Sequence, residues 1–153
     1  MSTWNIIDSP ESIVSLLDAS GGFHDSHLVK LWYQSGDYRS GKNSIAYGSP
    51  EDHELHMVFH SVWYDFPLEL CFNSVRTYHI AGYQKYYETE IFDCHLAFHT
   101  DLYAGSDDPL IVWADTCEFS PKTYALENLL HEPMVCYVVA DHLKWRFLEI
   151  SEE

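Results

Sequence analysis

Basic residues are scarce in this sequence. Eight Lys and Arg stand against 24 Asp and Glu, which gives a formal net charge of −16. A surface that binds nucleic acid is built from Lys and Arg, because its affinity comes largely from neutralising phosphates. The composition therefore argues against nucleic acid as a partner. Self-repulsion of this size also opposes the compact state while keeping the protein soluble.

Long apolar runs are missing as well. No stretch reaches the roughly 18 consecutive apolar residues of a membrane helix, since residues 134–148 are interrupted by Asp141, Lys144 and Arg146. The N-terminus has no basic region followed by an apolar run, so it does not look like a secretion signal. We therefore expect a cytoplasmic protein with no membrane partner.

Motifs with a defined chemistry are also absent. The sequence contains no GxSxG, P-loop, GxGxxG or CxxC element. Its four cysteines stand singly inside apolar runs at wide spacing, as buried small hydrophobic residues do. We therefore expect no catalytic residue, no cofactor and no resident metal.

Apolar periodicity predicts a mainly β (α+β) fold in a single domain over residues 1–153. A helix is expected over residues 10–19, because Ser9 and Pro10 are a typical N-cap and first position and Gly21 a typical stop. Alternation predicts about seven strands, at residues 27–38, 54–62, 68–73, 88–99, 110–119, 134–139 and 142–150. We expect an antiparallel sandwich or a partly open barrel, with the helix against the sheet. The strands at 54–62 and 68–73 should form a hairpin, the strand at 110–119 should pair with the one before it, and Phe92 should point inward. Residues 39–52 read as a loop, 74–87 as an irregular stretch and 121–131 as a second short helix.

Phe23, His24 and Asp25 stand between the predicted helix and the first strand, directly after two glycines. Glycines at this point can take the backbone conformations that end a helix, so we interpret the three residues as a structural corner. An enzyme that uses His24 or Asp25 is a less favoured alternative, because catalytic groups usually meet from distant segments.

Ten histidines raise a further alternative, a small-ligand or metal-binding β-barrel. His56 and His60, like His95 and His99, are four residues apart in predicted strands. Their α-carbons would then lie about 13 Å apart, which we judge too far to chelate one ion together. Such a barrel would need histidines from separate strands to converge on one cavity.

A segment without Lys or Arg runs over residues 86–121 and holds eight acids, half the net charge. A uniformly solvated acidic surface and a surface matched to a basic partner both remain open. Tyrosines, which are enriched at interfaces, adjoin this segment. The candidate partner-binding residues are Glu88, Glu90, Asp93, Asp101, Asp107, Asp108, Tyr83, Tyr86 and Tyr87.

Three stretches carry a resemblance over residues 20–100. They are Phe23-His24-Asp25-Ser26, Leu55-His56-Met57-Val58-Phe59 and Leu68-Glu69-Leu70-Cys71-Phe72-Asn73-Ser74-Val75. This pattern resembles a group of small bacterial β-rich proteins, many of them immunity proteins of polymorphic toxin systems. The resemblance implies a cytosolic, non-enzymatic protein that binds and neutralises a cognate toxin domain. An acidic surface would suit a basic toxin domain.

Overall fold

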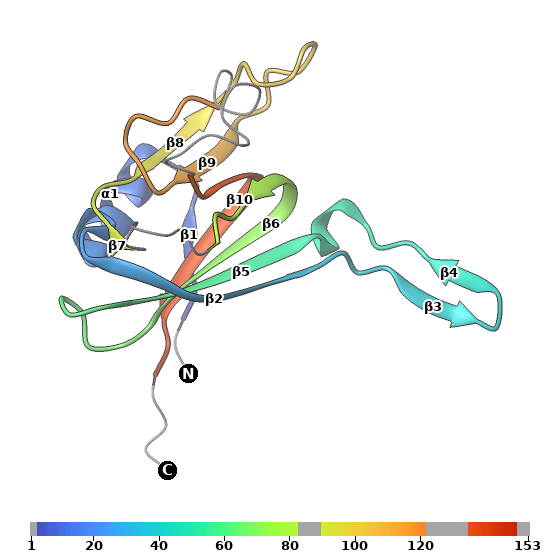
Figure 1. The fold of residues 1–153 in the computed structure, drawn as a ribbon. Helices are drawn as coiled ribbons and strands as arrows, with labels where there is room; N and C mark the ends of the chain where they lie inside the picture. Colours follow the sequence, from blue (N-terminus) through green and yellow to red (C-terminus); the bar gives the residue numbers. More distant parts are fainter. Residues whose placement is uncertain (1–2, 83–89, 122–134, 150–153) are drawn as a thin grey trace.

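The computed structural model describes residues 3–82, 90–121 and 135–149. Seven strands form one curled antiparallel sheet, a half-barrel, in the order β7-β2-β5-β6-β10-β9-β8 (Figure 1). Their bounds are β2 (Ser26–Gln34), β5 (Glu54–Ser61), β6 (Leu68–His79), β7 (Glu90–Ile91), β8 (His95–His99), β9 (Leu110–Ala114) and β10 (Tyr137–Phe147). A short β1 (Asn5–Ile7) pairs with β10. The predicted mainly β class is confirmed, as a partly open barrel.

Helix α1 (Pro10–Ser20) forms where the sequence predicts a helix. The Ser9 side chain accepts from the Ser12 backbone N–H, the Ser12 side chain accepts from the Ser9 N–H, and Gly21 ends the helix in the left-handed conformation at φ 62°. Ile13 and Leu16 are buried in the same core as the sheet residues. The helix therefore packs on the sheet as predicted.

The predicted hairpin of β5 and β6 is present and fixes the two faces of the sheet. Its register places Glu54 opposite Asn73 and His56 opposite Cys71. Because side chains alternate along a strand, Leu55 and Met57 enter the core while Glu54 and His56 lie on the outer face. The outer face of this hairpin holds the candidate site described below.

The C-terminal strand corrects one prediction. Instead of two strands around a turn at residues 140–141, β10 runs unbroken from Tyr137 to Phe147, with a register shift between Val139 and Ala140. Asp141, which suggested a turn, pairs with Arg76 of β6 at 2.9 Å. A bulge held by this ion pair replaces the expected turn.

Three other segments also differ from prediction. Residues 39–52, expected to be a loop, include an outlying hairpin of β3 (Tyr38–Gly41) and β4 (Ser44–Ala46) (Figure 1). Strand β6 extends to His79 through a stretch expected to be irregular. The strand expected over residues 88–99 is divided into β7 and β8, and Phe92 between them is 77% exposed rather than inward. The second helix, predicted at 121–131, falls outside the described residues except for Pro121.

Within the described residues, no helix has both the length and the hydrophobicity needed to cross a membrane.

Candidate functional site

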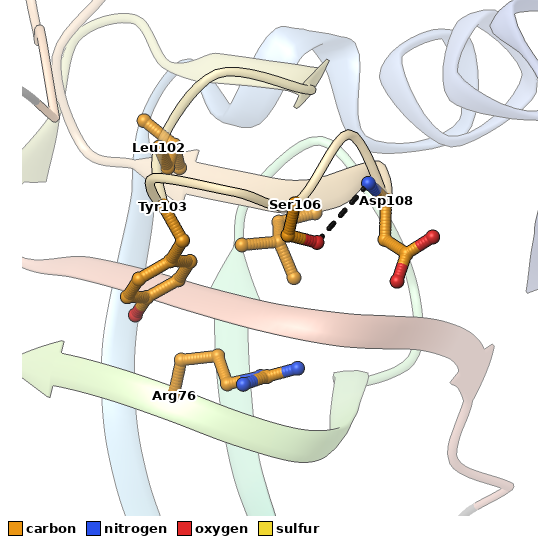
Figure 2. A pocket seen from close by; sticks show the side chains of 6 residues that line it. Arg76, Leu102, Tyr103, Ser106 and Asp108 are labelled. Atoms are coloured by element: carbon orange, nitrogen blue, oxygen red, sulfur yellow. Dashed lines mark hydrogen bonds between the residues drawn. The ribbon is translucent and has the colours of Figure 1, made fainter.

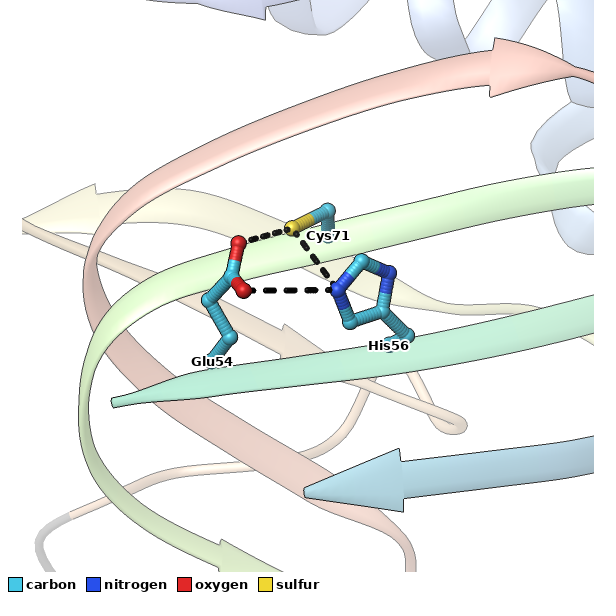
Figure 3. A group of neighbouring side chains, drawn as sticks. All are labelled: Glu54, His56 and Cys71. Carbon is cyan, nitrogen blue, oxygen red and sulfur yellow. Dashed lines mark hydrogen bonds and ion pairs between the residues drawn. The ribbon is translucent and has the colours of Figure 1, made fainter. Parts of the chain in front are cut away.

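Three potential ligand groups converge on the outer face of the β5–β6 hairpin. Glu54 and His56 come from β5 and Cys71 from β6, and Figure 3 shows their side chains turned toward one another. The Cys71 Sγ lies 3.7 Å from His56 Nε2 and 3.5 Å from Glu54 Oε1, and Nε2 lies 3.7 Å from Glu54 Oε2. We call Glu54, His56 and Cys71 the outer-face cluster.

Glu69 fixes the orientation of the His56 ring. The ring Nδ1 lies 2.7 Å from Glu69 Oε1, and Glu69 Oε2 accepts from Arg146 Nε at 3.0 Å. Because a carboxylate can only accept, Nδ1 carries the hydrogen, and in the neutral ring Nε2 presents its lone pair to Cys71. Trp32 stacks on the ring with centroids 4.5 Å apart. The imidazole is therefore fixed by a hydrogen bond at its Nδ1 edge and by stacking of Trp32 on its ring face.

Glu54 is held by neutral donors. Asn73 Nδ2 donates to its Oε1 at 3.1 Å, and Gln34 Nε2 donates to its Oε2 at 2.6 Å. Burial alone would raise the pKa of Glu54, but the hydrogen bonds from Asn73, Cys71 and Gln34, together with nearby His56, lower it overall. The carboxylate is therefore kept ionised beside the thiol.

The Cys71 thiol is kept protonated. Burial and the neighbouring Glu54 raise its pKa to about 12. Although Cys71, His56 and Glu69 follow the order of a nucleophile, base and orienting acid, a reactive cysteine needs a lowered pKa and access to solvent. Cys71 has neither, since it is fully buried. The arrangement suits a ligand set better than covalent catalysis.

A second feature is the loop between β8 and β9, which carries Asp101, Asp107 and Asp108, all exposed. We call residues 100–109 the acidic loop. A pocket opens against it, with the Tyr103 ring and the Asp108 carboxylate on opposite sides (Figure 2). The pocket is lined by Arg76, Leu102, Tyr103, Ser106, Asp108 and Leu110.

The other predicted partner-binding residues do not join this loop. Glu90 lies on β7, at the other end of the strand order from β8. Asp93 accepts hydrogen bonds from the backbone N–H of Cys117 at 2.8 Å and from the Cys117 thiol at 3.0 Å. These bonds lower the pKa of Asp93. Glu88, Tyr83, Tyr86 and Tyr87 fall outside the described residues.

The corner residues make contacts with distant segments. Phe23 is fully buried, at φ 61°, with its ring 5.2 Å from that of Phe59. His24 Nδ1 lies 2.8 Å from the Phe92 backbone oxygen, and Asp25 accepts from Trp63 Nε1 at 2.6 Å. The corner is thereby tied to the core, to the residue after β7 and to the β5–β6 turn.

Comparison with protein-family models, with curated proteins and with solved structures found no match. The functional argument therefore rests on the residues themselves.

The expectation that histidines four apart on a strand cannot meet is wrong for His95 and His99. Their Nε2 atoms lie 2.9 Å apart, because long side chains can lean toward each other over a distance that separates their α-carbons. Among the described residues, the one group of three or more potential metal ligands is the outer-face cluster, which includes His56 but neither His60, His95 nor His99.

Sequence reasoning missed Glu54 and Cys71 as members of a site, because Cys71 was interpreted only as a small core residue. A hairpin that turns over residues 62–67 would place His56 opposite Asn73. The observed register pairs Phe59 with Leu68 and so places His56 opposite Cys71. Cys117, also expected to be buried, is exposed.

Proposed function

We propose that this chain is an immunity-type protein that binds a basic cognate toxin domain through the acidic loop, in the cytoplasm and without enzymatic activity. One observation carries the proposal: Asp101, Asp107 and Asp108 gather on a single exposed loop within a segment that has no Lys or Arg. A loop of this charge complements the cationic surface that a nuclease-like toxin needs to bind phosphate.

The pocket beside the acidic loop gives such a partner a place to anchor. Tight interfaces usually depend on a few side chains that fill pockets surrounded by polar contacts. Leu102 and Leu110 offer apolar walls, and Tyr103 remains 45% exposed. The pocket thus combines apolar contact area with an acidic rim at Asp108.

The charge of Arg76 is matched mainly by Asp141, and Asp108 of the loop interacts with it more weakly. Its guanidinium bonds the Asp141 carboxylate at 2.9 and 3.3 Å and lies 5.7 Å from the Tyr103 ring centroid. The Arg76 charge is thus already matched by Asp141. Arg76 also supports the Tyr103 ring, which a partner would contact.

Growth rescue tests the proposal. A gene for a basic toxin domain is first sought beside the gene for this chain, and that domain is then expressed in bacteria together with the wild-type chain or with the variant Asp101→Lys, Asp107→Lys, Asp108→Lys. We expect the wild type to restore growth and the variant to fail, because the variant presents cations to a cationic surface.

The matched control reverses three exposed acids on other parts of the chain, Asp18, Glu51 and Asp65. It has the same net charge as the loop variant and should still rescue growth. Rescue by the loop variant, or equal failure of both folded variants, would contradict a role for the acidic loop.

A further inference from the structure

We propose that the outer-face cluster is a binding site for a divalent zinc-type metal ion, with Glu54, His56 and Cys71 as its ligands. One donor atom from each residue lies within 4.8 Å of the other two. The inference concerns the face of the β5–β6 hairpin and does not depend on the acidic loop or on a toxin partner.

The distances between donor atoms fit tetrahedral coordination. With metal bonds of about 2.3 Å to sulfur and about 2.0 Å to nitrogen and oxygen, the edges of a tetrahedral site are about 3.3 to 3.6 Å. The observed separations are 3.7 Å from Sγ to Nε2, 3.7 Å from Nε2 to Oε2 and 3.5 Å from Sγ to Oε1. The two distances to Glu54 involve different carboxylate oxygens, so the carboxylate must rotate to bring a single oxygen close to both partners, starting from a set of three donor atoms within 4.8 Å of one another.

The surroundings of the cluster match those of a metal site. A ligating histidine usually donates its second ring N–H to a carboxylate, which fixes the ring and raises its basicity. Glu69, only 3% exposed, accepts this hydrogen bond from His56 and is itself held by Arg146. A buried carboxylate on a hairpin's outer face thus orients the imidazole lone pair toward Cys71.

The charges also balance. When the metal–sulfur bond forms, the Cys71 thiol loses its proton to solvent, and the thiolate and the Glu54 carboxylate together neutralise a divalent ion bound with neutral His56. The side chains of His56 and Glu54 are 14% and 23% exposed. Solvent can therefore reach the cluster from the side of His56 and Glu54 and supply a fourth ligand there, while Cys71 itself is fully buried.

Cobalt titration of the full chain, stripped of metal with a chelator, tests the site. Co²⁺ replaces Zn²⁺ in tetrahedral sites, and a bound thiolate gives a sulfur-to-cobalt charge-transfer band in the near ultraviolet. We expect one Co²⁺ per chain with this band, displaced by Zn²⁺. Cys71→Ser should abolish the band, and Glu69→Gln should weaken binding about 10- to 100-fold, as loss of an orienting carboxylate does.

Cys117→Ser is the matched control, because Cys117 is exposed and bonded to Asp93, a second thiol–carboxylate pair. It should keep the band and the affinity. Since Cys71 is buried, Glu54→Gln serves as a milder variant, with folding checked by circular dichroism; its affinity should fall about tenfold or more.

Absence of the band in the wild type would overturn the proposal. So would a band lost in Cys117→Ser, or cobalt binding that Glu54→Gln leaves unchanged. Binding without a thiolate band that His99→Ala abolishes would place the ion at the His95–His99 pair and would equally contradict it.

Discussion

At the scale of single residues, the burial of Asp115 should make the stability of the fold depend on pH. It follows β9, and its carboxylate accepts from the Cys136 backbone N–H at 3.1 Å. Desolvation raises the pKa of Asp115 from 3.8 to about 6, and the Cys136 hydrogen bonds offset only part of this effect. Because the folded state holds the proton more tightly than the unfolded chain, stability falls as the pH rises from about 3.8 to about 6, and the full loss persists above that range.

Asp115→Asn should therefore stabilise the protein at about pH 7 and have no effect at about pH 3, where the carboxyl is protonated in both the folded and the unfolded state. The full shift corresponds to about 3 kcal/mol, and residual contact with water should reduce the gain to about 1 to 2 kcal/mol. Urea unfolding across this pH range measures it. Asp107→Asn changes the net charge equally at an exposed position, and a similar gain in that control would contradict the role of burial.

The candidate site was only partly predictable from individual residues. His56 was singled out, but its partners were sought among other histidines, whereas the cluster takes a carboxylate from its own strand and a thiol from the next. Cross-strand register brings Cys71 to His56, and the burial of Glu69 follows from the closeness of β10 to β6. Side-chain type alone does not contain that register.

At the scale of elements, the N-terminus of α1 depends on reciprocal bonds between Ser9 and Ser12. A helix of this length has little stability by itself, so its cap and its docked face must both contribute. Ser9→Ala should lower the free energy of unfolding by about 1 kcal/mol, because it removes the acceptor for the Ser12 N–H. Chemical denaturation measures the loss.

Ser15→Ala is the control, because Ser15 lies on the exposed side of α1 and its hydroxyl only donates to the Glu11 carbonyl. Its stability should stay within about 0.5 kcal/mol of the wild type. Equal losses at Ser9 and Ser15 would show that the cap does not stabilise the helix.

Elements with a local signal were predicted well, and those decided by tertiary contacts were not. The start of α1 at Pro10 and the pairings β5–β6 and β8–β9 follow from caps and alternation. The unbroken β10 does not, because its pairing with β6 along residues 137–147 and with β9 along residues 137–140 overrides the turn preference of a local Ala-Asp. The outlying β3–β4 hairpin has short, mostly exposed strands, in which Tyr38 and Ile45 stand singly among polar residues and give no apolar alternation.

At the scale of the whole molecule, a net charge of −16 should make stability depend on salt. Raising the ionic strength from about 0.01 M to about 0.15 M shortens the Debye length from about 30 Å to about 8 Å. Repulsion among the acids then weakens, so the urea midpoint should rise with added NaCl.

The loop variant Asp101→Lys, Asp107→Lys, Asp108→Lys should gain less from the same salt, since each of its three substitutions adds two charges and leaves −10. A midpoint that does not move with salt, or one that falls, would contradict self-repulsion as a cost of the fold.

The fold class was predictable because apolar alternation recurs along most of the sequence. The sheet order was not, since it depends on which edges meet. The acids of residues 86–121 also lie in different parts of the fold, which the sequence does not show. Asp93 is bonded to Cys117 and Glu90 lies on β7, so we expect a partner to contact the acidic loop rather than these two residues. The toxin-binding function remains a prediction.

The central claim is that the acidic loop binds a cationic protein. The most direct measurement is the affinity of the purified chain for a basic toxin domain identified in its gene neighbourhood, followed by association kinetics at low and physiological salt. We expect binding that weakens as salt rises, and at least about a tenfold loss in the Asp101→Lys, Asp107→Lys, Asp108→Lys variant, mainly through slower association. Equal affinity of wild type and variant, or an association rate independent of salt, would contradict the account.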